Sequence, residues 1–298
     1  MSALEPTPPP PDPRLGACVV VPARDEEERV GACLDALAAQ VAIEPPEYEV
    51  LLVLDACTDE TAERVRAAAA RHFELRLYLL DGPGRGSGPA RALGMNTACE
   101  RLHAAGRPSG LIASTDADSR VAPDWLSAQL AAAERGARAI GGRIELCARE
   151  RELLPPRVVE GHAERGRGRH LQVLADPREG PYAEHWQFSG ASMAVTACAY
   201  AAVGGLPAGP DLEDERLEQA LRTHGVTIER SLAVRVTTSA RTDGRATRGL
   251  ARDLAEAWGL VSEGRSAATR REPGEITVEH QRDADLAGVG TAPRSRSR

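Results

Sequence analysis

Lysine is absent from this 298-residue chain, so all 37 of its basic residues are arginine. The absence excludes chemistries that need a lysine side chain: a Walker A phosphate site, a Schiff base with a carbonyl substrate or pyridoxal phosphate, and a lysine general base. Aromatic residues are also scarce, at 3% of the sequence. The core must therefore be built mainly from Ala, Val, Leu and Ile.

Membrane-spanning and disulfide-linked classes are disfavoured as well. No apolar run approaches the ~18 residues that a transmembrane helix needs, and the proline-rich start of the chain does not resemble a signal peptide. The six cysteines are widely spaced without a CxxC pair, which argues against a zinc site or a disulfide framework. Cys18 and Cys33 lie in apolar patterns typical of free thiols in a reducing compartment. We therefore expect a soluble, cytoplasmic protein.

Positive charge is not in excess. The formal net charge is −7, whereas nucleic-acid-binding proteins usually carry a basic excess, so we expect no nucleic-acid partner. Hydrophobic residues make up 42% and charged residues 27% of the chain, which suits a packed core under a charged surface. We expect one domain over residues 15–264, between a disordered proline-rich leader (1–14) and a disordered charged tail (265–298).

Apolar runs of strand length alternate with segments of helical periodicity. The expected strands cover residues 17–21, 50–54, 75–80, 111–115, 139–146 and 233–238. The expected helices cover 26–40, 89–102, most of 149–178 and 245–261, together with a helix capped by Thr58 and one that begins near Pro123. Continuous apolar strands separated by helices predict a Rossmann-like α/β fold with a mostly parallel sheet flanked by helices.

Polar residues follow three of these strands where each strand ends. The first strand runs into Pro22–Glu26, the second into Asp55 and the fourth into Asp116–Asp118. Ligands bind beyond the carboxyl ends of strands in open α/β sheets, so we expect these residues to share one crevice. A dinucleotide site is disfavoured, because PARDEE stands at the first turn in place of GxGxxG.

The Asp116-x-Asp118 pair is the most informative of these features. Carboxylate oxygens are the ligands that Mg²⁺ and Mn²⁺ take together with substrate phosphates. Taken singly, Asp118 is more typical of a cap on the helix near Pro123, and Asp55 of a turn. Their joint position at strand ends favours a metal–nucleotide site.

Several motifs together resemble those of family 2 glycosyltransferases with the GT-A fold. The resemblance rests on VVVPARDEEERVGACLDAL, VLLVLDACTDETAE, STDADSRVAPDWL, SGASMAVTACAYAAVGGL and LEDERLEQALRTHG, and it covers about residues 16 to 250. The stretch VTTSARTDGRATRGL is similar to a small bacterial subgroup without a membrane domain. The resemblance implies transfer of a sugar from a nucleotide-diphosphate donor, with a UDP-sugar expected, to the hydroxyl of an unknown small-molecule, glycan or lipid acceptor.

The resemblance also implies roles for individual residues. The nucleotide-sugar site would comprise Pro22, Ala23, Arg24, Glu26, Asp55, Arg91, Asp116, Ala117 and Asp118. Asp118, with Asp116, would hold Mg²⁺ or Mn²⁺. Asp214 and Glu213 would be catalytic, with Asp214 as the base of an inverting reaction. Two departures are that Asp55 stands alone, where many relatives have paired acids, and that VTTSART lacks a histidine, where some relatives have a further metal ligand.

For several residues in the second half of the chain, two interpretations stay open. Arg241 suits a diphosphate, because arginine pairs with phosphate oxygens through two hydrogen bonds. His185, Trp186, Gly190 and Ala191 suit an acceptor pocket. The plainer interpretations are a solvated loop for Arg241, a core tryptophan beside a surface histidine, and acids at residues 213–215 that favour a helix N-terminus.

Two other functions stay open at this stage. One is a retaining GT-A enzyme similar to glucosyl-3-phosphoglycerate synthases, and the other is a protein that binds a nucleotide sugar without transferring it. A sugar nucleotidyltransferase is disfavoured by the missing lysine and by the missing glycine-rich loop after the first strand. The aliphatic second half would suit a homodimer.

Overall fold

The computed structural model describes residues 8–206, 212–244 and 249–260. The expected tail, 265–298, lies outside the described residues, and the expected domain boundaries stay predictions. Residues 8–14 of the expected disordered leader are packed against the body. Arg101 donates a hydrogen bond to the carbonyl of Pro9 (2.7 Å), and Arg107 donates one to the carbonyl of Pro13 (3.2 Å).

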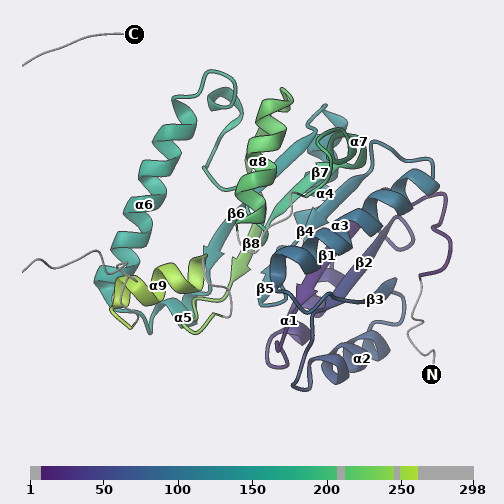
Figure 1. Ribbon diagram of the computed structural model, residues 1–298, viewed down its shortest axis with the longest axis horizontal. Coiled ribbons are helices and arrows are strands. Elements are labelled where there is room, and N and C mark those ends of the chain that lie inside the picture. Colours follow the sequence, from purple (N-terminus) through teal and green to yellow (C-terminus); the bar gives the residue numbers. More distant parts are fainter. Residues whose placement is uncertain (1–7, 207–211, 245–248, 261–298) are drawn as a thin grey trace, which may run out of the picture. The chain divides into compact units, whose positions relative to one another are not determined.

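The described strands form one eight-stranded sheet in the order β3-β2-β1-β4-β7-β6-β8-β5 (Figure 1). Its strands are β1 (Ala17–Ala23), β2 (Tyr48–Leu54), β3 (Leu77–Asp81), β4 (Leu111–Ser114), β5 (Ser119–Val121), β6 (Ala139–Leu146), β7 (Met193–Thr196) and β8 (Ile228–Thr238). Strands β3, β2, β1 and β4 pair parallel with one another, and β6 pairs parallel with β8. Only β7 and β5 pair antiparallel with their neighbours in this described sheet. The predicted mostly parallel α/β sheet is confirmed.

Helices connect these strands largely where the periodicity predicts them. They are α1 (Val30–Ala38), α2 (Thr61–Arg71), α3 (Ser87–Ala104), α4 (Trp125–Glu134), α5 (Ala148–Arg151), α6 (Pro156–Leu174), α7 (Ala197–Ala202), α8 (Glu213–Thr223) and α9 (Leu250–Trp258), with a 3₁₀ turn, η1, at Gly180–Tyr182. Residues 149–178 split into α5 and α6 because a proline pair, Pro155-Pro156, interrupts them. The first four residues of the helix expected over 245–261 lie outside the described residues.

The sequence predicts that Thr58 caps α2, and this prediction is wrong. The residue at the N-cap is Glu60. The backbone N–H and the hydroxyl of Thr58 instead donate to Oδ1 of Asp25, at 2.6 Å and 3.2 Å. The turn after β2 is therefore tied to the turn after β1, a contact between residues 33 positions apart that no local pattern reveals.

Both faces of the sheet are buried, as continuous apolar strands require. Val19, Val21, Val50 and Leu52 face the core that α1, α2 and α4 cover, whereas Cys18, Val20 and Leu51 face the core under α3, α7 and α8. Figure 1 shows α3 and α8 on the viewer's side of the sheet. No helix among the described residues is long and apolar enough to cross a membrane.

The topology collects the ends of several segments at one edge of the sheet. Strands β1, β2 and β4 are parallel, so the residues after each of them emerge together. Strand β7 runs the opposite way, so the segment before it reaches the same edge. Ser119 pairs with Thr238, which brings the turn at Asp118 beside the end of β8. The sheet therefore places four distant segments around one point.

Gly94 tests the contact between α3 and β1. A methyl group at this position would lie 2.4 Å from Cγ1 of Val20 and 3.1 Å from Cγ2 of Val53. We expect Gly94→Ala to lower the free energy of unfolding by about 1–3 kcal/mol, because the core must open to admit the methyl group. Urea denaturation measures the change.

Gly31 provides the matched control, because nothing lies within 4 Å of a methyl group built there on α1. Gly31→Ala should leave the free energy of unfolding unchanged or raise it by up to about 1 kcal/mol, since alanine favours the helix. Equal effects of the two substitutions would contradict the close packing of α3 on β1.

Candidate functional site

The guanidinium of Arg91, on α3, lies at the centre of the site, and its side chain is only 4% exposed. Nε donates to Oε1 of Glu213 (3.1 Å), and Nη2 donates to Oδ1 of Asp116 (2.7 Å). Nη1 donates to Oγ of Ser114 (2.5 Å) and to the carbonyl of Gly190 (3.1 Å). One side chain thus joins the end of β4, the segment before β7 and the start of α8.

The contacts of Arg91 are both charged and tightly packed. Burial alone lowers the pKa of a guanidinium, but the carboxylates of Asp116 and Glu213 outweigh it and raise the pKa of Arg91. A Cβ at Gly190 would lie 2.4 Å from Nη2 of Arg91, so a larger residue there would displace the guanidinium. The N–H of Gly190 donates to Oδ2 of Asp214 at 3.2 Å. Asp214 is therefore positioned by the same segment that contacts Arg91.

A second arginine pairs with the other carboxylate of the Asp116-x-Asp118 motif. Nη2 of Arg241 lies 2.9 Å from Oδ2 of Asp118. The same guanidinium donates to both carboxylate oxygens of Glu26, at 3.0 Å and 2.5 Å. Oδ1 of Asp118 accepts from the hydroxyls of Ser119 (3.3 Å) and Thr238 (3.5 Å). Glu26, Asp118 and Arg241 therefore form one cluster, with side chains between 7% and 16% exposed.

Negative charge is concentrated at Asp118. Burial, with the nearby charges of Asp116 and Glu26, raises the pKa of Asp118 to about 6, although Arg241 opposes the shift. For Arg241, burial lowers the pKa, but the hydrogen bonds to Glu26 and the charge of Asp118 raise it overall. The residues fit a divalent cation, because the donors are carboxylate oxygens and a guanidinium already stands among them as a cation.

Asp55 organises the glycine-rich loop that leads into α3. Its Oδ1 accepts from the N–H of Gly84 (2.6 Å) and its Oδ2 from the N–H of Gly86 (2.8 Å), while the residue is 1% exposed. A Cβ at Gly82 would lie 2.8 Å from Oδ1 of Asp55, so the loop passes very close to the carboxylate. Nη1 of Arg24 lies 4.0 Å from Oδ2. Binding of a nucleobase by Asp55 stays a prediction, beside this role in holding the loop.

The remaining residues expected to bind nucleotide lie at the same edge. Pro22 and Ala23 are buried at the end of β1, where the carbonyl of Ala23 accepts from the N–H of Asp55 (2.8 Å). The side chain of Arg24 is 44% exposed, which leaves it open to a ligand. Ala117 is buried between the two aspartates. The structure brings these residues together, while their contacts with a nucleotide stay predictions.

His185 is a buried residue rather than an open one. Its Nδ1 accepts from the N–H of Gln187 (3.0 Å), and its Nε2 lies 3.2 Å from the carbonyl of Ser231. Burial, with the charges of Arg143 and Arg230, lowers its pKa to about 4. Both ring nitrogens thus contact backbone. The plainer interpretation of a surface histidine is wrong, while a role for His185 in an acceptor pocket stays a prediction.

The other residues assigned to an acceptor pocket differ in their surroundings. The guanidinium of Arg169, on α6, lies 4.7 Å from the centre of the Trp186 ring. Ala191 is buried in the core under α4. Gly190 alone of this group contacts Asp214. The structure therefore places Gly190 beside the expected catalytic residue and gives Ala191 a packing role.

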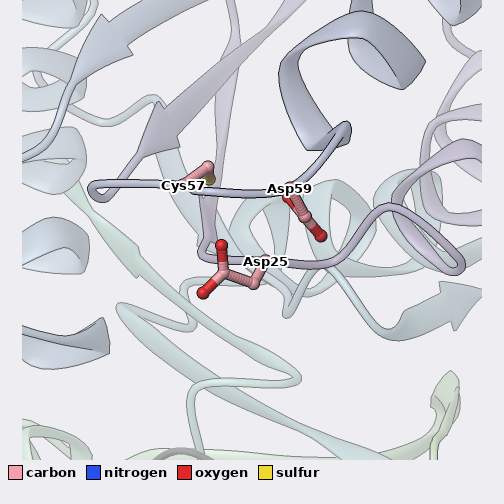
Figure 2. A group of neighbouring side chains, drawn as sticks. All are labelled: Asp25, Cys57 and Asp59. Carbon is pink, nitrogen blue, oxygen red and sulfur yellow. The ribbon is translucent and has the colours of Figure 1, made fainter.

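Asp25, Cys57 and Asp59 form a group of possible metal ligands that the sequence analysis did not select (Figure 2). In the part of the chain that the structure describes, no other group of three such residues lies as close together. Figure 2 shows Asp25 opposite the segment that carries Cys57 and Asp59. Oδ2 of Asp59 accepts from the N–H of Glu27 (3.1 Å). With the Asp25–Thr58 bonds, this contact joins the turns after β1 and β2, which accounts for the grouping.

Glu150, on α5, is a positioning residue that the sequence did not reveal. Its Oε2 accepts from the hydroxyl of Ser239 and from the N–H of Ala240, each at 2.6 Å. These bonds fix the turn that carries Arg241. No motif marks Glu150, because it lies 89 positions from Ser239 in a charged stretch of the sequence.

Arg91 provides a test of how the site is held together. We expect Arg91→Met to lower the free energy of unfolding by about 3–5 kcal/mol, because Glu213 would remain buried without its charged partner. Urea denaturation of the two proteins measures the difference.

Arg66→Met is the matched control, since Arg66 pairs with Glu63 (3.2 Å) on the exposed surface of α2. This substitution should change the free energy of unfolding by less than about 0.5 kcal/mol. Similar small effects for both variants would mean that Arg91 does not hold the three segments together.

Comparison with protein families gives one match over this region. The model described as Glycosyl transferase family 2 matches residues 18–186, which include both arginine-paired aspartates and the loop at Asp55. No curated protein matches the sequence.

Solved structures share the fold. The mannosyltransferase PcManGT from Pyrobaculum calidifontis, in complex with GDP-Man and Mn²⁺, is 24% identical over 78% of this chain and 60% of its own, with a TM-score of 0.53. S. aureus TarS in complex with UDP-GlcNAc is 15% identical over 83% of this chain and 66% of its own, with a TM-score of 0.57. The chain thus spans less than two thirds of either structure, and at these identities the likeness shows the fold alone.

Proposed function

The chain belongs to glycosyl transferase family 2, whose model matches more than half of its length, and we propose that it is an inverting, cation-assisted transferase of sugars from nucleoside-diphosphate donors. One observation supports this proposal above the others. The Asp116-x-Asp118 motif and the expected base, Asp214, meet at one edge of the sheet, where Arg91 and Gly190 join them. The two halves of a transfer site, for donor and for acceptor, thus adjoin one another.

A nucleotide-sugar donor fits the edge formed by β1, β2 and β4. The structures with the same fold hold GDP-Man in one case and UDP-GlcNAc in the other. We expect a UDP-sugar, with a GDP-sugar as the second candidate. The exposed Arg24 and the turn at Asp55 would contact the nucleoside, and Asp116, whose side chain is 35% exposed, would face the sugar or ribose.

The Asp118 carboxylate is held in place by side chains around it, in an orientation suited to a cation. The hydroxyls of Ser119 and Thr238 fix one carboxylate oxygen, and the other faces Arg241. Mg²⁺ or Mn²⁺ held at Asp118, with Asp116, would supply the positive charge that stabilises the departing diphosphate. Arg241 would add hydrogen-bond donors for the phosphate oxygens, as the geometry of a guanidinium permits.

Asp214 is suited to remove the proton from the acceptor hydroxyl. The N–H of Gly190 donates to Oδ2 and the N–H of Glu215 donates to Oδ1, at 3.2 Å and 2.9 Å, so the carboxylate is held in one orientation. Asp214 lies in the first turn of α8. As the hydroxyl oxygen attacks the anomeric carbon, Asp214 takes its proton, and the bond from that carbon to the diphosphate oxygen breaks. Attack from the face opposite the nucleotide inverts the anomeric centre.

The acceptor is assigned only by class, as a hydroxyl compound that reaches Asp214 beside Gly190. A homodimer and a cytoplasmic location also stay predictions from the sequence. A retaining enzyme of the same fold is the second candidate, and the anomeric configuration of the product, read by NMR, separates the two mechanisms.

A donor panel tests the proposal directly. We expect one nucleotide sugar among UDP-, GDP- and dTDP-sugars to raise the melting temperature, and to do so more strongly with Mn²⁺, because ligands stabilise the state that binds them. Slow release of free sugar from the same donor would distinguish a transferase from a silent binding protein. A protein that no sugar nucleotide stabilises would contradict the proposal.

Asp214→Asn tests the base. Turnover should fall at least about a hundredfold, because the amide does not accept the proton, while the donor should stabilise the variant as it stabilises the unmodified protein. Glu215→Gln, the exposed neighbour on α8, is the matched control and should keep normal turnover. Near-normal turnover by Asp214→Asn would refute the assignment.

A further inference from the structure

One guanidinium contacts two carboxylates that follow neighbouring strands of the sheet. Arg241, in the turn after β8, lies 2.9 Å from Oδ2 of Asp118 and 3.0 Å from Oε2 of Glu26. Glu26 follows β1 and Asp118 follows β4, and these strands are neighbours in the sheet. The two acids therefore lie close enough to share a single cation, which in this structure is an arginine side chain.

The arginine is held in this position by its own turn. Glu150 accepts from the hydroxyl of Ser239 and from the N–H of Ala240, and the N–H of Arg241 donates to the same hydroxyl (3.2 Å). Arg241 is thus directed at Glu26 and Asp118 by contacts that involve neither of them. This turn links Arg241 to α5.

A cation at Asp118 needs oxygen ligands beyond those of the Asp116-x-Asp118 motif, and Glu26 is a carboxylate beside it. The segment VTTSART, which spans the end of β8, contains no histidine. The Asp116-x-Asp118 motif provides two acids. Asp116 is already bonded to the buried Arg91. Glu26 is the other carboxylate that faces the same positive group as Asp118, and Mg²⁺ and Mn²⁺ bind such oxygen ligands.

We propose that Glu26 and Asp118 together ligate the divalent cation, and that Arg241 occupies their site until the cation displaces it. The inference rests on the proposed function, since it concerns the same cation. Two positive groups repel strongly at this distance, so cation and guanidinium exclude one another between the two acids. Once displaced, Arg241 is available to the diphosphate of the donor. Binding of the cation and of the nucleotide is therefore coupled.

Titration with Mn²⁺ alone tests the competition. Calorimetry, with the free Mn²⁺ signal followed by electron paramagnetic resonance, measures the dissociation constant without any donor or turnover. We expect Arg241→Gln to bind Mn²⁺ roughly tenfold more tightly than the unmodified protein, because the competing charge is gone. Arg235→Gln is the matched control: it removes an exposed arginine of β8 that pairs with Asp124 (3.2 Å) and should leave Mn²⁺ binding unchanged.

The double variant Glu26→Gln with Arg241→Gln tests the ligand. The double variant removes the Glu26 carboxylate together with the Arg241 guanidinium that donates to it, and circular dichroism compares its folding with that of Arg241→Gln. If Glu26 is a ligand, the double variant binds Mn²⁺ about tenfold or more weakly than Arg241→Gln. If Glu26 only holds the arginine, the two variants bind alike, and the ligand assignment is overturned.

The nucleotide completes the test. With saturating Mn²⁺, Arg241→Gln should bind UDP or GDP roughly tenfold more weakly, whereas Arg235→Gln should not. Unchanged or weaker Mn²⁺ binding by Arg241→Gln would overturn the competition, whatever the enzyme transfers. Failure of the transferase proposal would show in the donor panel instead, since Mn²⁺ binding here is measured without a donor.

Discussion

A buried guanidinium must have its charge and its N–H groups satisfied, and the site depends on this requirement at Arg91. Asp116, Glu213, Ser114 and the carbonyl of Gly190 meet it together. They come from the end of β4, the start of α8 and the segment before β7. The native arrangement of all three is therefore needed to bury Arg91, and the same contacts bring the expected donor side and the expected base into one site.

The two aspartates of the motif are neutralised in different ways. Arg91 is enclosed in the fold, and its partners include a buried glutamate, so the charge near Asp116 is a permanent part of the structure. Arg241 lies on a turn and pairs with Glu26 and Asp118 at the edge of the site. In this chain without lysine, Arg91 therefore holds the site together, whereas Arg241 is the arginine that a metal ion would displace. This difference in position explains why Asp118, rather than Asp116, is proposed as a main cation ligand.

Close backbone approach is the second constraint on the site. Gly190 admits the guanidinium of Arg91, and Gly82 admits the carboxylate of Asp55, where a Cβ would lie 2.4 Å and 2.8 Å from them. Asp55 in turn holds the loop before α3, which carries Arg91. The glycine-rich stretch therefore passes close enough to the end of β2 for Asp55 to accept hydrogen bonds from its backbone.

The sequence by itself determined the alternation of strands and helices, the acids at the ends of β1, β2 and β4, and the family. These follow from local apolar runs, from periodicity and from contiguous motifs. Only the tertiary structure decided which acid pairs with which arginine, that His185 is buried against backbone, and that Glu150 fixes the turn of Arg241. The physical reason is distance along the chain: Arg91 and Glu213 are 122 positions apart, and Arg241 and Glu26 are 215 apart. Ion pairs of this kind depend on how the sheet orders its strands, and no local pattern carries that order.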